Sequence, residues 1–324
     1  MCDDDMTFAT AGGIIGVSHL ANVQIEDCHN SGAITLTLKK KTPLTPGSYA
    51  GGIIGFSYIG DGAQVSINSS TNSGRIYLKI ENNATCLFKR AGVGGIAVLR
   101  SSNQSNDSIS QRSYSIIRNC SNSGDVIITS LQTPFSVFAG GIVGCETNTT
   151  SVFSNLTLDG CVNSGNVVVT GAPAKASGLV VFNTTGELTI SSSMNSGKVQ
   201  GSETAFGLAD KVDLVENSVN VGFFNSSTAF GISQAAKVSE SVVNIGDFLS
   251  GVIRCNTTFG SNPQLFNTFY SNNCSTTGSG QLIFIDDTTN RWLVNESFDD
   301  VVGLLNNQTK EHKYNRWWTS NLTL

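Results

Sequence analysis

The sequence predicts an all-β protein, a parallel β-helix (β-solenoid) of about eight imperfect repeats with a short C-terminal cap that contains a helix. Two short phrases recur in a fixed order, and apolar residues alternate with polar ones beside the second phrase. The composition agrees, because 34 Gly, 5 Pro and only 13% charged residues leave few stretches with the Leu, Ala, Glu and Lys mixture of a stable helix. We therefore divide the chain of 324 residues into a repeat domain, 1–280, and a capping segment, 281–324.

The first phrase contains paired glycines and reads Ala-Gly-Gly-Ile-Ile-Gly at residues 11–16 and again at 50–55. It precedes each of the first seven copies of the second phrase. Paired Gly allows two backbones to pack where a side chain would clash. The last copies lose the pair, so we expect the final coils to be less regular.

The second phrase is Asn-x-Gly, usually Asn-Ser-Gly, and successive Asn residues are 42, 50, 41, 32, 25 and 24 residues apart. The shortest intervals are expected to be bare coils and the longer ones to carry inserted loops. A decayed eighth copy lies at 276–278. The candidate structural residues of the seven copies are Asn30 and Gly32, Asn72 and Gly74, Asn122 and Gly124, Asn163 and Gly165, Asn195 and Gly197, Asn220 and Gly222, and Asn244 and Gly246.

Apolar residues recur at fixed positions around each Asn, with mostly polar residues between them. Five positions before the Asn stand Ile25, Ile67, Ile117, Leu158, Ile190 and Val215. Two positions after the Gly stand Ile34, Ile76, Val126, Val167, Val199, Phe224 and Phe248. The column seven positions before the Asn is also apolar, with Ser115 and Asp213 as exceptions. This period of two is typical of a strand with one buried face, and coils stacked about 4.8 Å apart would bury that face.

Each residue of the second phrase has an expected structural role. We expect the Gly to adopt a positive φ at the corner between two strands. We expect the Asn to stack on its copies above and below, with the amides hydrogen-bonded along the rod. A buried amide left unpaired would cost about 1–3 kcal/mol, which favours an unbroken ladder.

A column of small, weakly polar residues stands two positions before the Asn. It contains Cys28, Ser70, Cys120, Cys161, Ser193 and Ser218, with Cys274 in the decayed copy. We interpret these as inward side chains that fill a tight corner. A disulfide between adjacent coils, Cys120–Cys161, and a reactive or metal site are the alternatives. The chain has 8 Cys and no Cys-x-x-Cys pair, so no zinc site and no cofactor are predicted.

The two phrases together resemble the GLUG-type repeat, over roughly residues 9–280. That repeat occurs in bacterial surface proteins, and similar repeats occur in large surface proteins of protists. The resemblance implies an extracellular β-solenoid, often part of an adhesin, and it supplies no catalytic residues.

Beyond residue 280 the repeat stops. Ser297 and the acids that follow it predict the start of a helix within 297–306. We expect Trp292, Trp317 and Trp318 to seal the end of the rod, because exposed strand edges aggregate. The alternative for these aromatic residues is a carbohydrate platform.

Sequons for N-glycosylation are frequent and favour an extracellular or cell-surface location. The candidate glycosylation sites are Asn68, Asn83, Asn103, Asn106, Asn119, Asn148, Asn155, Asn183, Asn225, Asn256, Asn273, Asn295, Asn307 and Asn321. No leader opens the chain, and we interpret its polar start as a cut within a longer protein or an incomplete gene model.

Several classes of function are not expected. The net charge of −5 without a basic stripe argues against nucleic-acid binding, and no stretch of 18 apolar residues predicts a transmembrane segment. The catalytic motifs of serine hydrolases, zinc proteases and phosphate-binding loops are missing from the sequence. The acids four positions before the Asn, namely Glu26, Asp159, Glu216 and Glu240, come nearest to a catalytic column, but a solvated polar face is the preferred interpretation.

We therefore predict a non-catalytic surface or secreted scaffold. It would recognise a protein or carbohydrate ligand, namely a host molecule or a glycan, through loops such as 38–49 and 99–115. The alternative is a polysaccharide-active β-helix enzyme, a lyase or a glycoside hydrolase. A tight exposed cluster of three or more charged groups in a groove would favour that alternative.

Overall fold

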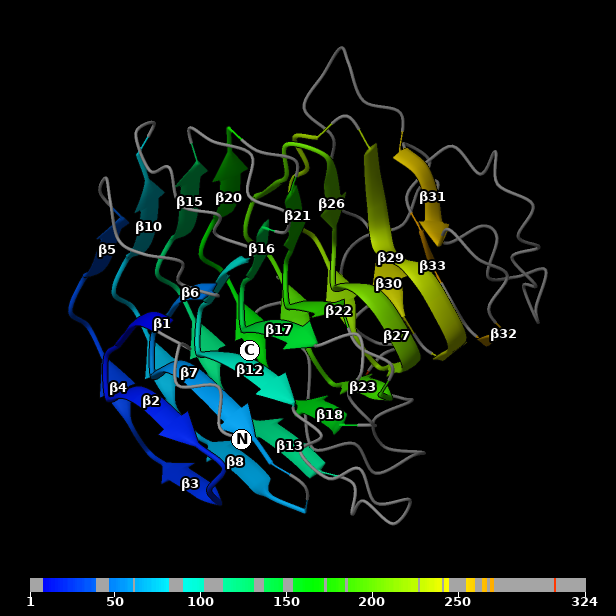
Figure 1. Cartoon of the computed structure of the whole chain (residues 1–324). Helices are drawn as coiled ribbons and strands as arrows, with labels where there is room; N and C mark the ends of the chain where they lie inside the picture. Colours follow the sequence, from blue (N-terminus) through cyan, green and yellow to red (C-terminus); the bar gives the residue numbers. More distant parts are fainter. Residues whose placement is uncertain are drawn as a thin grey trace.

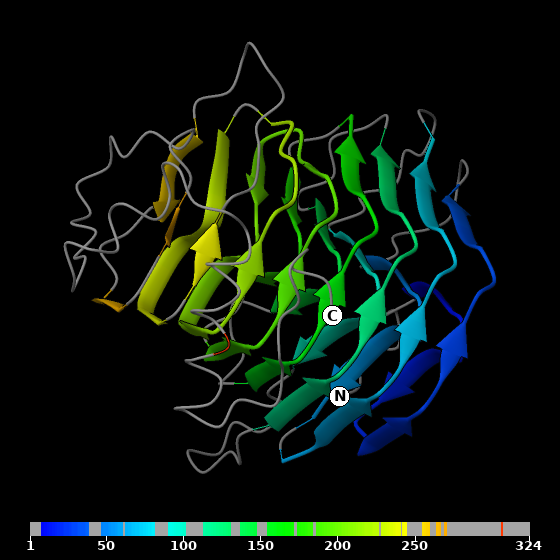
Figure 2. The same ribbon diagram turned by 180° about the vertical axis from the view of Figure 1, so that it is seen from behind.

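The fold was determined as a computed structural model of the whole chain (Figure 1). The structure describes residues 8–38, 47–60, 62–81, 90–101, 113–130, 137–147, 154–171, 174–183, 186–226, 228–240, 242–244, 255–259, 264–266, 269–270 and 306. The strands of these ranges stack into a rod, and strands from equivalent places in successive repeats lie side by side along it (Figures 1 and 2).

Each coil contributes strands to five rows that run along the rod. The first row holds β1 (Phe8–Gly12), β6 (Gly47–Gly51), β11 (Ala91–Gly94), β16 (Val137–Gly140), β21 (Ala174–Ser177) and β26 (Thr204–Phe206). The second holds β2 (Ile15–His19), β7 (Ile54–Ile59), β12 (Ala97–Ser101), β17 (Val143–Thr147) and β22 (Val180–Asn183). The third holds β3 (Val23–Glu26), β8 (Gln64–Asn68), β13 (Ser113–Arg118), β18 (Ser154–Asp159) and β23 (Leu188–Ser191).

The fourth row carries the Asn of the first seven repeats and Tyr270 in the last strand, and the fifth row follows it. The fourth holds β4 (His29–Asn30), β9 (Thr71–Asn72), β14 (Ser121–Asn122), β19 (Val162–Asn163), β24 (Met194–Asn195), β28 (Val219–Asn220), β30 (Val243–Asn244) and β33 (Phe269–Tyr270). The fifth holds β5 (Ile34–Leu38), β10 (Ile76–Ile80), β15 (Val126–Ser130), β20 (Val167–Thr170) and β25 (Val199–Gln200).

In the later coils, single strands span several rows. β27 (Ala209–Glu216) continues the second and third rows, and β29 (Thr228–Glu240) covers the first three. β31 (Cys255–Phe259) and β32 (Gln264–Phe266) then pair with the two ends of β29. These long strands occur where the paired Gly is lost. Phe206 and Phe230 occupy the position of the first Gly, and their ring centroids are stacked 5.7 Å apart. The predicted irregularity thus takes the form of longer strands, while the stacking itself continues.

The strand pairs of the described residues are parallel and keep the repeats in register, apart from shifts between β7 and β12 and between β29 and β31. The column Ile25, Ile67, Ile117, Leu158, Ile190 and Val215 is paired residue by residue and buried. The all-β parallel β-helix predicted from the sequence is therefore confirmed.

The interior of the rod is divided into two hydrophobic cores. One contains Ile53, Ile67 and their equivalents, from the second and third rows. The other contains Ala50, Ile76 and their equivalents, from the first and fifth rows. The chain crosses from one core to the other twice in each coil, at the paired Gly and at the Asn.

The asparagine ladder is present as predicted. Each Asn Nδ2 donates a hydrogen bond to the Oδ1 of the Asn in the next coil, and the six N–O distances from Asn30 to Asn244 are 2.7, 2.7, 2.9, 2.9, 3.0 and 2.8 Å. From Asn30 to Asn195 the same Nδ2 also donates to the carbonyl of the Gly two residues later, at 2.9 Å between Asn72 and Gly74. From Asn72 to Asn244 the ladder is fully buried, so every amide within it needs these partners.

The glycine phrase and the asparagine phrase meet in space. A Cβ added to Gly52 would lie 2.5 Å from Cγ of Asn72, and one added to Gly141 would lie 2.4 Å from Cγ of Asn163. The same Cβ atoms would lie 2.1 and 2.0 Å from the carbonyl oxygens of the glycines in the next coil. The second Gly of the pair is therefore required by close packing against the ladder, which separates the two cores.

The prediction of positive φ at the Gly of the second phrase was wrong. It fails at Gly32, Gly74, Gly124, Gly165, Gly197 and Gly222, while Gly246 lies outside the described residues. The left-handed corner falls instead three positions before the Asn, at Asp27, Ser69, Asn119, Gly160, Ser192 and Asn217. The Gly is required for another reason, because a Cβ on Gly124 would lie 2.1 Å from the carbonyl oxygen of Gly74 in the preceding coil.

Several predictions fall outside the described residues. These are Phe248 of the apolar column and the cap at 281–324 with its three Trp, and within that cap only Asn306 is described. The prediction of a decayed eighth copy at 276–278 was wrong, because Tyr270 pairs with Asn244 and so takes the Asn position of the eighth coil.

Replacing Gly124 with Val tests why this glycine is needed. The new side chain would meet the backbone of Gly74, and we expect the free energy of unfolding to fall by at least about 1–3 kcal/mol. Gly32→Val is the matched control, because a Cβ there meets nothing closer than Asn30 Oδ1 at 3.5 Å. It should change stability by no more than about 0.5 kcal/mol. Equal losses in urea unfolding of the two variants would contradict this explanation.

Candidate functional site

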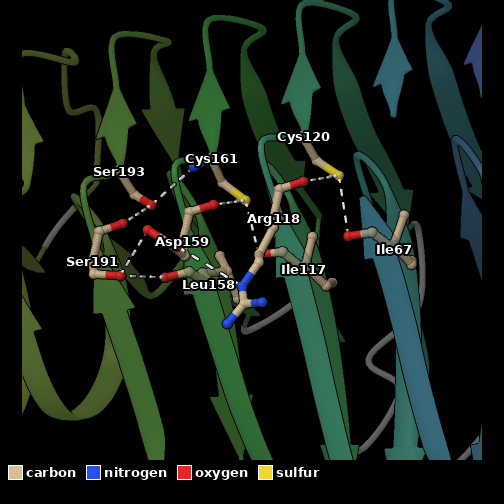
Figure 3. Close-up of polar contacts among 9 residues, drawn as sticks. All are labelled: Ile67, Ile117, Arg118, Cys120, Leu158, Asp159, Cys161, Ser191 and Ser193. Carbon is tan, nitrogen blue, oxygen red and sulfur yellow. Dashed lines mark hydrogen bonds and ion pairs between the residues drawn. The ribbon is translucent and has the colours of Figure 1, made fainter. Parts of the chain in front are cut away.

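The small residues two positions before the Asn form an inward column that is almost entirely buried (Figure 3). Its serine hydroxyls each make two hydrogen bonds. Ser193 Oγ donates to the carbonyl of Ser191 at 2.7 Å and accepts from the backbone N–H of Cys161 at 3.0 Å. Ser70 and Ser218 make the equivalent pairs of contacts. The column therefore secures the backbone next to the left-handed corner.

The cysteines of this column are free thiols. Cys120 Sγ donates to the carbonyl of Arg118 at 3.1 Å, and Cys161 Sγ donates to the carbonyl of Ile117 at 3.3 Å (Figure 3). A hydrogen bond from the Cys161 side chain holds the pKa of the Cys120 thiol below its ordinary value, and burial opposes this effect. The structure thus shows small inward side chains, and not the alternative disulfide between Cys120 and Cys161. Cys274 lies outside the described residues.

The predicted acid column faces outward from the third row, but other residue types interrupt it. Arg118 Nε lies 3.8 Å from Oδ2 of Asp159, and Ser191 Oγ donates to Oδ1 of the same carboxylate at 3.0 Å (Figure 3). Asn68 Nδ2 donates to Oε1 of Glu26 at 3.3 Å. These contacts make a hydrogen-bonded polar face, which agrees with the preferred interpretation of the column.

Only one pair of acids in this column is adjacent along the rod. Glu216 and Glu240 are partners in the pairing of β27 with β29, as their spacing predicted. Glu216 is half-buried, and the side chain of Glu240 lies outside the description.

A depression lies between β27 and β29, and the sequence did not predict it. It has a volume of about 270 Å³ and is lined by Gly186, Lys211, Val212, Asp213, Ala235, Ala236 and Lys237. We call it the charged depression. Three of its residues carry charge, and they come from two adjacent coils. The one signal in the sequence was Asp213, a charged residue in a column that is apolar apart from Ser115.

Asp213 connects three coils. Its Oδ2 accepts a hydrogen bond from the backbone N–H of Leu188 at 2.8 Å, and its Oδ1 pairs with the ammonium group of Lys237. The hydrogen bond and charge of Asp213 raise the pKa of Lys237 above its ordinary value. Since a raised pKa keeps a lysine protonated at higher pH, Lys237 remains a cation at neutral pH and is no proton acceptor there.

The described sequons differ in their surroundings. Asn119 is exposed at a left-handed corner. Asn68, Asn155 and Asn225 are half-buried, and each donates to a side chain of a neighbouring coil: Glu26, Glu187 and Gln200, respectively. Asn183 and Asn256 lie in β22 and β31, and the other candidate sites lie outside the described residues.

The described part of the chain contains no helix long and apolar enough to cross a membrane and no group of three or more His, Cys, Asp or Glu placed to hold a metal ion. The chain matches no family model, no curated protein and no solved structure at a significant level. The resemblance to GLUG-type repeats therefore stays a prediction.

Substitution of Cys161 by Ser tests whether the column needs sulfur. A hydroxyl at this position should adopt the two hydrogen bonds of Ser193, so we expect the free energy of unfolding to change by no more than about 1 kcal/mol. Cys161→Val, which adds volume and removes the donor, should cost about 1–3 kcal/mol. Denaturant unfolding under reducing conditions measures both. A large loss for the Ser variant alone would show that the thiol has a role other than packing.

Proposed function

We propose that the protein is a non-catalytic surface or secreted scaffold that recognises a protein or glycan ligand through the loops inserted between its strands. The observation that carries the proposal is the placement of the insertions. They leave the rod at two fixed points of the coil, so that insertions from neighbouring coils begin and end next to one another.

The strand register defines the first of these points. Ser101 at the end of β12 is paired with Thr147 at the end of β17, and Ser113 at the start of β13 is paired with Ser154 at the start of β18. The segments 102–112 and 148–153 therefore depart and return side by side. Insertions on a rigid scaffold are where binding residues commonly reside.

The second point follows the fifth row. Leu38, Ile80 and Ser130 are stacked partners at the ends of β5, β10 and β15. The segments 39–46, 82–89 and 131–136 begin just after them. The predicted loops 38–49 and 99–115 correspond to one segment at each point, although the central residues of both lie outside the described part of the chain.

An extracellular or cell-surface location is part of the proposal. Four candidate glycosylation sites, Asn83, Asn103, Asn106 and Asn148, fall within these inserted segments. Sequons in segments inserted between strands suit a secreted protein. The resemblance to repeats of surface proteins points in the same direction.

The charged depression favours the second candidate, a polysaccharide-active enzyme, because it brings three charged groups together in a hollow. However, the state of its charged groups suits the binding of a ligand better than acid–base catalysis. Lys237 is held as a cation, and both oxygens of Asp213 already accept hydrogen bonds. Proton transfer at neutral pH would require one of these groups to be released first.

Shortening the 102–112 segment to a brief Gly-Ser link tests the proposal. We expect binding to cells or to a glycan array to fall at least about tenfold, while the melting temperature stays unchanged because the paired strands on either side are retained. Shortening 131–136 in the same way, at the other point of insertion, shows which of the two points contacts the ligand, and unchanged binding in both variants would contradict the proposal. Turnover of a polysaccharide that is lost in Glu216→Gln or Glu240→Gln would instead establish the enzyme.

A further inference from the structure

The charged depression combines a small apolar floor with cationic walls. Gly186, Ala235 and Ala236 have little or no side chain, which creates the hollow, and Lys211 and Lys237 are exposed beside them. Lys211 is paired in register with Ala235, so the lysines come from adjacent coils and are offset by two residues along the strands. The hollow of about 270 Å³ has room for one pyranose ring.

The contacts within the depression determine which of its charged groups can pair with a ligand. The lining residues carry two positive charges and one negative charge. Asp213 is neutralised by Lys237 and anchored by the N–H of Leu188, and Glu187 also acts electrostatically on Lys237. Lys211 is exposed and forms no ion pair within the described structure. The site therefore offers an available ammonium group to an anion, beside carboxylate oxygens that can accept hydrogen bonds from hydroxyl groups.

We propose that the charged depression binds a hexuronate, one carboxylated sugar residue of an acidic polysaccharide. The carboxylate of the sugar would pair with Lys211, its ring would lie over Ala235 and Ala236, and its hydroxyl groups would donate to Asp213. The inference rests on the proposed function, and it specifies the class of glycan.

The strand arrangement favours a sugar over an acidic peptide. β27 is paired with β22 and β23 on one side and with β29 on the other, and β29 is paired in turn with β26, β27, β31 and β32. On the side of β22 and β23 the pairing of β27 stops at Ala209 and resumes at Leu214, so the unpaired stretch at the depression is short and closed at both ends, which leaves no open strand edge along which a peptide could add. The net charge of −5 for the whole chain disfavours general attraction of polyanions, so binding would depend on the local ammonium group of Lys211.

The test is isothermal titration of the full chain with tetragalacturonate, with maltotetraose as the neutral probe and a tetraglutamate peptide as the acidic probe. The wild type is expected to bind tetragalacturonate alone. Lys211→Gln should weaken binding about tenfold, the usual effect of losing one charge-assisted hydrogen bond. Lys198→Gln is the matched control, since it removes the same charge from a half-buried position outside the depression.

Lys211→Gln is the primary variant because Lys211 has no bonded partner in the described structure, whereas Lys237→Gln would also release Asp213. The proposal fails if tetragalacturonate does not bind, if Lys211→Gln binds as tightly as the wild type, if Lys198→Gln loses as much affinity, or if the glutamate peptide binds equally well. If the titration fails but shortening 102–112 abolishes cell binding, only the hexuronate site is rejected and the proposed function stands. Failure of both experiments would reject recognition by the scaffold itself.

Discussion

The contact between the asparagine ladder and the glycine column determines the cross-section of every coil. An Asn amide lies directly against the backbone of the second Gly of the pair, where even a methyl group would clash. This contact draws the fourth row against the bend between the first and second rows and divides the interior into two cores. Because the amides are buried, their bonds to the next Asn and to the following Gly carbonyl are both needed, which fixes the register along the rod.

The remaining columns follow from this register. With the ladder aligned, the branched apolar residues of successive coils are stacked in contact, and the left-handed corners recur at one position in each coil. The Ser and Cys side chains next to those corners hold the backbone by hydrogen bonds to neighbouring coils. The outward column of the third row is under no such constraint, which explains why residue types vary there between Glu26, Asn68 and Arg118 in otherwise equivalent positions.

We expect ligand binding at places where the contact between the Asn ladder and the paired Gly no longer restricts the residues. Insertions are tolerated at two points of the coil because strand pairing resumes on their far side, and the rod then sets the spacing between them. The charged depression arises in the later coils, where the paired Gly is lost and β27 and β29 run through positions at which earlier coils bend. A charged residue can then replace an apolar one at Asp213, because its carboxylate is held by the Leu188 N–H and by Lys237.

The sequence by itself determined the fold, the ladder and the buried columns, because stacking repeats one local environment and so repeats the residues that suit it. It placed Ile67 and Ile117 in one core column and Asn72 beside Asn122 before any coordinates were known. It misplaced the positive φ, since the need for glycine at Gly124 arises from the backbone of the preceding coil and not from its own dihedral angle. Only the tertiary structure brought Lys211, Asp213 and Lys237 together, because an outward cluster depends on the offset between two strands and leaves no periodic mark in the sequence.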